Sequence, residues 1–133
     1  MNTIPRLLPF RSGQSTCLIA ITLLAGIVGC RTAATPSLAE QFASIQKLMT
    51  QAEVIQILGQ PPTKRSDNFP DGHFMGPQEG LIGVVAPGQA YEEWKYTGGG
   101  NVYLIFFAGA RPDDPQNQWN VVGKIDYPQG TAF

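Results

Sequence analysis

Residues that bind metals or carry out covalent catalysis are scarce in this chain. Among 133 residues there is one histidine, His73, and there are two cysteines, Cys17 and Cys30. These residues are not grouped with carboxylates at the spacing that a zinc site requires. His73 lies in a stretch dense in turn-forming residues, where a solvated loop histidine is the ordinary reading. We therefore expect no enzyme activity, no bound metal and no cofactor.

Two further motifs lack the partners that their chemistry needs. Asp113 and Asp114 lie together in a polar segment, but the spaced oxygen ligands of a calcium-binding loop are missing. The three glycines at 98–100 are not followed by a Lys-Ser/Thr pair or by a predicted helix, as a phosphate-binding loop would be. The aspartates are expected to form a loop tip and the glycines a turn.

A strong charge of either sign is also lacking. Nine lysine and arginine residues stand against ten aspartate and glutamate residues, which gives a formal net charge of −1. No basic run or patch is present to neutralise a phosphate backbone. Nucleic acid is therefore not expected as a partner.

The N-terminal apolar run at 17–28 is shorter than the roughly 20 residues that a membrane-spanning helix needs. It follows Arg6 and Arg11, an order typical of a secretory signal. It leads into Ile-Val-Gly-Cys30, which resembles a bacterial lipobox, whose cysteine sulfur receives a diacylglyceryl group before cleavage. We predict a lipoprotein signal peptide at 1–29 and a lipidated Cys30 with a tether at 30–36. A non-cleaved anchor helix, or an ordinary signal followed by a chance cysteine, are the alternatives.

This anchor predicts a place in the cell envelope. Several acyl chains hold a domain on a membrane more firmly than one chain does. Arg31, rather than aspartate, follows Cys30, which resembles lipoproteins sent to the outer membrane of Gram-negative bacteria. Removal of 1–29 would leave one cysteine, so no intramolecular disulfide is expected.

Two helices are predicted at the start of the mature domain. Ser37 and Glu40 form a capping box before an apolar periodic stretch, which indicates a helix at about 38–47. Thr50 and Glu53 repeat the box before a helix at 51–58, and Gly59 follows as its end signal. Two short amphipathic helices in succession need another layer on which to bury their apolar faces.

Three strands follow, at 91–96, 102–107 and 119–127, with a turn at 98–101. The middle strand is apolar on both faces, as expected of a central strand covered on both sides. Residues 64–90 read as an irregular insertion, in which 81–86 is a short strand or an apolar loop over the core. The predicted fold is α+β and two-layered: two short N-terminal helices packed on a three-stranded antiparallel meander. The domain is placed at 37–127, with a tail at 128–133.

The segment around the second helix resembles the SmpA/OmlA (BamE-like) outer-membrane lipoprotein family, whose signature is Gly-Met-Thr-x-x-Glu-Val-x-x-x-Leu-Gly-x-Pro. The matching residues are Met49, Thr50, Glu53, Val54, Leu58, Gly59 and Pro61. Trp94-Lys95-Tyr96 resembles the family's Trp-x-Tyr, and 103–107 resembles its apolar strand. Leu48 replaces the usual glycine, and the segments at 64–90 and 111–118 are longer than in the family. The helix–sheet layout is also similar to the repeat unit of β-lactamase-inhibitor proteins.

The resemblance implies a non-catalytic binding or scaffold domain, an accessory in outer-membrane or envelope protein assembly, with a protein partner. If the helices cover one face of the sheet, Tyr103, Ile105 and Phe107 would lie on the other and form the partner surface. The parity of the strand leaves open which set faces the helices. The alternative is an inhibitor-type or ligand-binding module that uses the 64–90 loop, since long irregular segments often carry binding functions.

Overall fold

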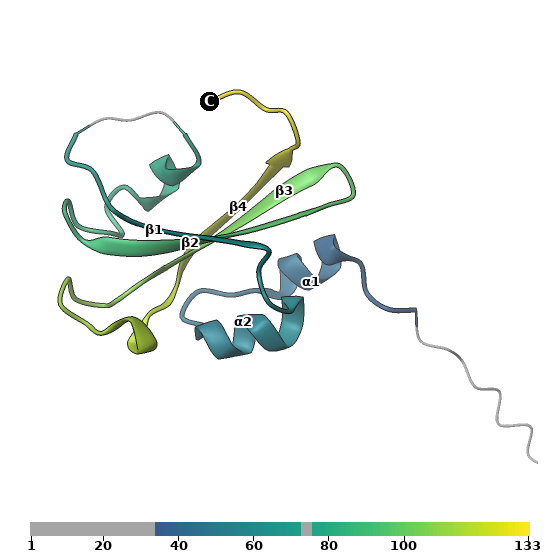
Figure 1. Ribbon diagram of the computed structural model, residues 1–133, viewed down its shortest axis with the longest axis horizontal. Helices are drawn as coiled ribbons and strands as arrows, with labels where there is room; N and C mark the ends of the chain where they lie inside the picture. Colours follow the sequence, from purple (N-terminus) through teal and green to yellow (C-terminus); the bar gives the residue numbers. More distant parts are fainter. Residues whose placement is uncertain (1–33, 73–75) are drawn as a thin grey trace, which may run out of the picture. The chain divides into compact units, whose positions relative to one another are not determined.

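The computed structural model describes residues 34–72 and 76–133 (Figure 1). Cys30 and His73 therefore lie outside the described residues. The elements are α1 (Leu38–Ser44), α2 (Gln51–Leu58), β1 (Thr63–Asn68), the 3₁₀ turn η1 (Pro77–Leu81), β2 (Ala90–Gly98), β3 (Asn101–Ala108), the 3₁₀ turn η2 (Gln116–Gln118) and β4 (Asn120–Pro128).

Both predicted capping boxes are present. The Ser37 N–H donates to Glu40 Oε2 at 2.7 Å, and the Glu40 N–H donates back to Ser37 Oγ at 3.3 Å. Thr50 and Glu53 repeat the exchange at 2.8 Å and 3.3 Å, and α2 has the predicted bounds. Helix α1 ends at Ser44, earlier than predicted, because Ile45 adopts an extended backbone and is 2% exposed in the core.

The sheet has four antiparallel strands in the order β1-β2-β3-β4, so the prediction of a three-stranded meander is wrong. All residues of the additional strand, β1, except Thr63 lie in the stretch 64–90 that was predicted to be irregular. All six of its residues are exposed, and its sequence Thr-Lys-Arg-Ser-Asp-Asn has no apolar alternation. Its strand conformation comes from pairing with β2, between Thr63↔Lys95 and Asn68↔Ala90.

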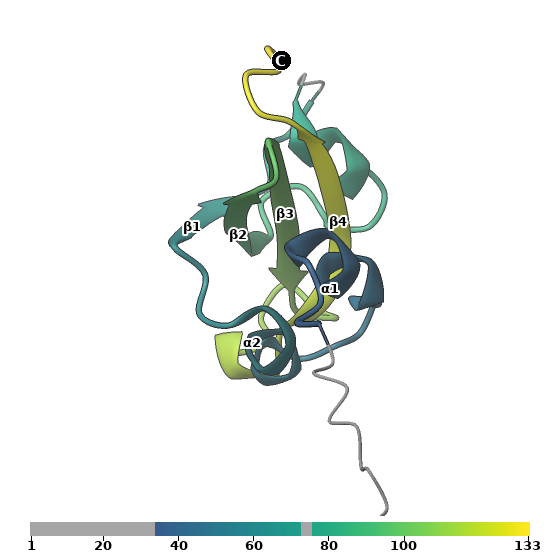
Figure 2. The same ribbon diagram turned by 90° about the vertical axis from the view of Figure 1, so that its right-hand side faces the viewer.

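Both faces of the sheet are covered, which is consistent with the apolar character of the central strand. Helices α1 and α2 cover one face (Figures 1 and 2). The fully buried Trp94 belongs to a cluster on this face. Its members are Phe42, Ile45, Val54, Trp94, Tyr96, Tyr103, Ile105, Phe107, Trp119 and Val121. On the opposite face, residues 69–72 and 76–89, which include η1, lie over the sheet; we call them the excursion. The buried residues there are Phe69, Leu81, Val85, Tyr91, Val102, Leu104, Phe106 and Ala108.

The outer edge of β4 is partly covered by the link between the helices. The Leu48 N–H donates to the Val121 carbonyl oxygen at 2.9 Å, and the Val121 N–H donates to the Met49 oxygen at 2.8 Å. Farther along β4, Lys124 Nζ donates to the carbonyl oxygens of Phe42 and Ala43 at 2.8 Å and 3.1 Å. This cation satisfies carbonyls at the end of α1, whose own last turn holds no basic residue.

Candidate functional site

The partner surface predicted on β3 is part of the core. Tyr103, Ile105 and Phe107 are 4%, 0% and 0% exposed and pack beneath the helices. The ring centroid of Phe107 lies 4.4 Å from that of Trp94. The expectation of an exposed apolar face is therefore wrong, because these residues face the helices and the excursion covers the other side of the sheet.

The excursion follows the second alternative for residues 81–86, an apolar loop over the core. Leu81 and Val85 are 1% and 2% exposed and act as its anchors. A tight turn joins them, in which the N–H groups of Val84 and Val85 both donate to the Leu81 oxygen at 2.9 Å and 3.0 Å. Gly83 in this turn has φ = 77°, a conformation that favours glycine. The turn leaves Ile82 and Val84 in solvent, 52% and 47% exposed.

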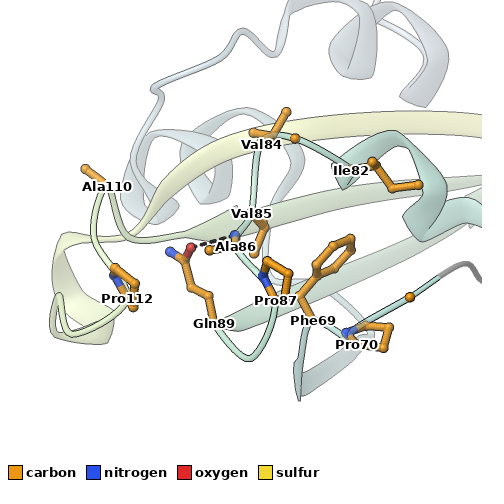
Figure 3. A pocket seen from close by; sticks show the side chains of 12 residues that line it. Phe69, Pro70, Ile82, Val84, Val85, Ala86, Pro87, Gln89, Ala110 and Pro112 are labelled. Atoms are coloured by element: carbon orange, nitrogen blue, oxygen red, sulfur yellow. Dashed lines mark hydrogen bonds between the residues drawn. The ribbon is translucent and has the colours of Figure 1, made fainter.

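A cavity of about 410 Å³ lies between the excursion and the loop that follows β3 (Figure 3). We call it the excursion pocket. Its lining residues are Phe69, Pro70, Gly72, residues 82–87, Gln89, Ala110 and Pro112. None of these residues carries a charge, and the exposed Ile82 and Val84 are among them. The pocket is thus an uncharged concavity with both polar and apolar lining, at which β-branched side chains are accessible from solvent.

The buried amide of Gln89 holds the two walls of the pocket together. Its Oε1 accepts from the Ala86 N–H at 3.0 Å (dashed in Figure 3), and its Nε2 donates to the Gly109 oxygen at 2.9 Å. Phe69 continues the pairing beyond β1, since its N–H donates to the Gln89 oxygen at 2.8 Å. Gln89 is 7% exposed, so these bonds form away from water and fix the loop in place.

The wall at Ala110 and Pro112 is braced from within its own loop. Asp114 Oδ2 accepts from the Arg111 N–H at 2.9 Å, and the Asp114 backbone oxygen accepts from Trp119 Nε1 at 2.9 Å. Of the two aspartates, Asp114 therefore braces the loop. Among residues 34–72 and 76–133, no three His, Cys, Asp or Glu side chains are grouped so that they could hold a metal ion.

One buried carboxylate was not singled out from the sequence. Glu92 is 5% exposed on the helix side of β2, where its Oε2 accepts from Gln51 Nε2 at 2.9 Å and from Gln116 Nε2 at 2.7 Å. The alternation of β2 could have predicted this burial. Glu92 lies two and four residues before Trp94 and Tyr96, so its side chain is on the same face of the strand. Its partners come from α2 and η2, so the carboxylate joins three elements of the fold.

Burial raises the pKa of tyrosines on both faces of the sheet. Burial raises the pKa of Tyr91, which lies beneath the excursion with its ring centroid 6.4 Å from that of Phe69. Burial also raises the pKa of Tyr96 to about 12 on the helix side. Both phenols therefore stay protonated and uncharged at neutral pH.

No family model, curated protein or solved structure matches this chain. The resemblance to the SmpA/OmlA family therefore remains a prediction from the residues around α2. In the part of the chain that the structure describes, none of the helices has the length and apolar character needed to cross a bilayer.

Proposed function

We propose that this chain is a non-catalytic binding protein, anchored to a membrane through a lipid on Cys30. The excursion pocket would bind an apolar side chain of a protein partner. The observation that carries this proposal is the exposure of Ile82 and Val84 at a pocket whose shape is already held by Gln89. Apolar side chains that stay in solvent beside a concavity are typical of a binding site.

The resemblance suggests the setting for this activity, which is an accessory role in outer-membrane or envelope protein assembly. Signal peptide, lipid anchor and envelope location belong to the same proposal, since they rest on the residues that end at Cys30. A mass spectrum of the mature N-terminus tests the anchor by itself. An unmodified Cys30, or an uncleaved residue 29–30 bond, would contradict it without affecting the pocket.

A second candidate function is an inhibitor-type or small-ligand module that uses the same loop. The volume of the pocket, about 410 Å³, favours it, since it falls within the roughly 300–1,000 Å³ of small-molecule sites. The small-ligand form of this candidate differs from the first candidate in whether a protein lies directly over Val84 in the cell.

Site-specific photo-crosslinking in intact cells separates them. A photoreactive residue at Val84 of the full-length chain is expected to give one discrete protein adduct. The same residue at Gln56, exposed on α2, is the control and should not give that adduct. If Val84 gives no protein adduct, the protein-partner proposal fails and the small-ligand candidate is favoured.

Substitution at the pocket gives the second arm of the test. Ile82→Asp in the full-length chain should abolish the Val84 adduct, because a carboxylate opposes burial in an apolar contact. Leu48→Asp is the matched control, since Leu48 is also an exposed apolar residue, 78% exposed, but does not line the pocket. Equal loss of the adduct with both variants would contradict a role specific to the pocket.

A further inference from the structure

The outer edge of β1 is a second surface, independent of the excursion pocket. Figure 2 shows β1 at one side of the sheet, next to β2 and farthest from β4. All six of its residues are exposed, whereas the start of β4 is paired with the link between the helices. Among residues 34–72 and 76–133, no other strand pairs with this edge of β1. A strand edge without a partner is a template for another strand.

The hydrogen bonds next to β1 show which of its backbone groups face outward. The Phe69 N–H donates to Gln89, and the Phe69 oxygen accepts from the Gly88 N–H at 2.7 Å, so Phe69 faces the β2 side. Backbone groups in an antiparallel pair alternate in direction. Those of residues 63, 65 and 67 therefore also face β2, and those of Lys64, Ser66 and Asn68 face away from it.

A bond at the end of the strand agrees with this alternation. The Asn68 N–H donates to Asp67 Oδ1 at 2.9 Å, not to β2. The carboxylate of Asp67 also accepts from Arg65 Nη2, its neighbour on the same face of the strand. In the single chain, the Asp67 carboxylate thus accepts from the outward-facing N–H of Asn68. Its negative charge is available to a positive charge on a second strand.

We propose that β1 is a homodimer interface, in which two copies of this chain pair antiparallel about a two-fold axis at Ser66. Ser66 then lies opposite Ser66 of the partner subunit, and Lys64 lies opposite Asn68 of the partner subunit. All three outward-facing residues of each strand are used. Arg65 lies opposite Asp67 of the partner subunit, and the symmetry repeats this contact.

The charges select this register over its neighbours. In the two neighbouring registers, outward-facing residues again pair with outward-facing residues. If the two-fold axis moves from Ser66 to residue 65, Arg65 lies opposite Arg65 of the partner subunit. If the axis moves to residue 67, Asp67 lies opposite Asp67 of the partner subunit. Opposite charges directly across a strand pair are stabilising and like charges are destabilising. The pattern Arg65-Ser66-Asp67 is therefore self-complementary in one register and self-repelling in both adjacent ones.

The other side of the strand does not obstruct this pairing. Lys64 points to the helix side, where its Nζ lies 4.4 Å from the centroid of the Trp94 ring. The side chains of Arg65 and Asp67 are 62% and 43% exposed on the excursion side. In the dimer each carboxylate would lie between two guanidinium groups and release the Asn68 N–H to the second strand.

Charge exchange tests the interface with the purified full-length chain in a reducing buffer of low ionic strength. Arg65→Asp leaves two aspartates on the strand, and Asp67→Arg leaves two arginines, so each variant repels itself. We expect the dimer dissociation constant of each to rise at least about tenfold, because two attractive contacts become two repulsive ones. An equimolar mixture of the two variants should recover a heterodimer, because both cross-strand pairs are again opposite in charge.

Analytical ultracentrifugation measures the association, and differently tagged variants report heterodimers. Ser66→Pro is a second variant that removes an outward N–H, which an edge strand tolerates without loss of its own pairing. It should be monomeric with an unchanged circular dichroism spectrum. A monomeric wild-type chain, or single variants that associate as the wild type does, would overturn the proposal. Absence of preferential association in the mixture would also overturn it.

Discussion

Leu48 is held against Val121 by a backbone hydrogen bond of 2.9 Å, and this contact requires an unusual backbone. Leu48 has φ = 71°, the left-handed region, and is the one described non-glycine residue there. The conformation turns the chain from α1 so that it runs beside β4 and then enters α2 at Thr50. In the family that this segment resembles, the signature has glycine at this position. The structure gives a physical reason, since glycine adopts positive φ without strain.

Leu48→Gly should therefore stabilise the fold. The left-handed conformation costs an ordinary residue about 1–2 kcal/mol, part of which is offset by the greater freedom of glycine in the unfolded chain. We expect a net gain of about 0.5–1 kcal/mol in urea unfolding. Leu48→Ala is the control and should change little, because it keeps the strain and removes an exposed side chain. A loss of stability in Leu48→Gly would show that the side chain itself makes a needed contact.

The second prediction concerns alkaline pH. The Tyr96 hydroxyl donates to the Gly59 oxygen at 3.0 Å and joins the end of α2 to β2. Burial raises its pKa from 10.0 to about 12, so the unfolded chain loses this proton first as the pH rises. The contribution of the protonated phenol to the free energy of unfolding is complete below pH 10. It is lost as the pH rises from 10 to about 12.

Tyr96→Phe separates this effect from that of other groups. Below pH 10 the variant should be less stable by about 1 kcal/mol, since a hydrogen bond is lost. Between pH 10 and 12 its stability should fall less steeply than that of the wild type. Parallel slopes for the two proteins in urea titrations at several pH values would contradict the assignment to Tyr96.

Gln89 is predicted to be the main polar support of the excursion pocket. Gln89→Leu keeps the volume but leaves the Ala86 N–H and the Gly109 oxygen without their partner. A buried unpaired group costs about 1–3 kcal/mol, so we expect a loss of about 2 kcal/mol or more by thermal or urea unfolding. Gln118→Leu, at an exposed position, should stay within about 0.5 kcal/mol of the wild type. Similar losses for both variants would mean that the amide bonds of Gln89 contribute little.

The fourth prediction concerns the corrected surface on β3. Phe107→Ala removes a fully buried ring that packs on Trp94, and should cost about 3–5 kcal/mol. Val84→Ala, on the exposed side of the excursion, should change stability by less than about 0.5 kcal/mol. Chemical denaturation of the two variants checks the assignment. A folded Phe107→Ala protein of near wild-type stability would contradict the assignment of this ring to the core.

Local signals were readable in the sequence wherever a few neighbouring residues determine the geometry. Ser37 with Glu40, and Thr50 with Glu53, satisfy the free N–H groups at helix starts by contacts that span three residues. Those contacts also lower the pKa of Glu40 and Glu53, because each carboxylate accepts from a backbone N–H and a hydroxyl. The strands β2, β3 and β4 were readable for a similar reason, since their buried side chains recur along the chain.

Strand β1 was not readable, because it buries no side chain and owes its conformation to the backbone of β2. The partner surface was misplaced for a related reason. The parity of β3 divides its residues between two faces, but both faces are apolar, so the pattern could not show which one the helices cover. The sequence by itself determined the helix caps and the central strand, and the lipid anchor on Cys30 stays a prediction from it. Tertiary packing decided the fourth strand, the burial of Tyr103, Ile105 and Phe107, and the excursion pocket, because these depend on contacts between segments far apart in the chain.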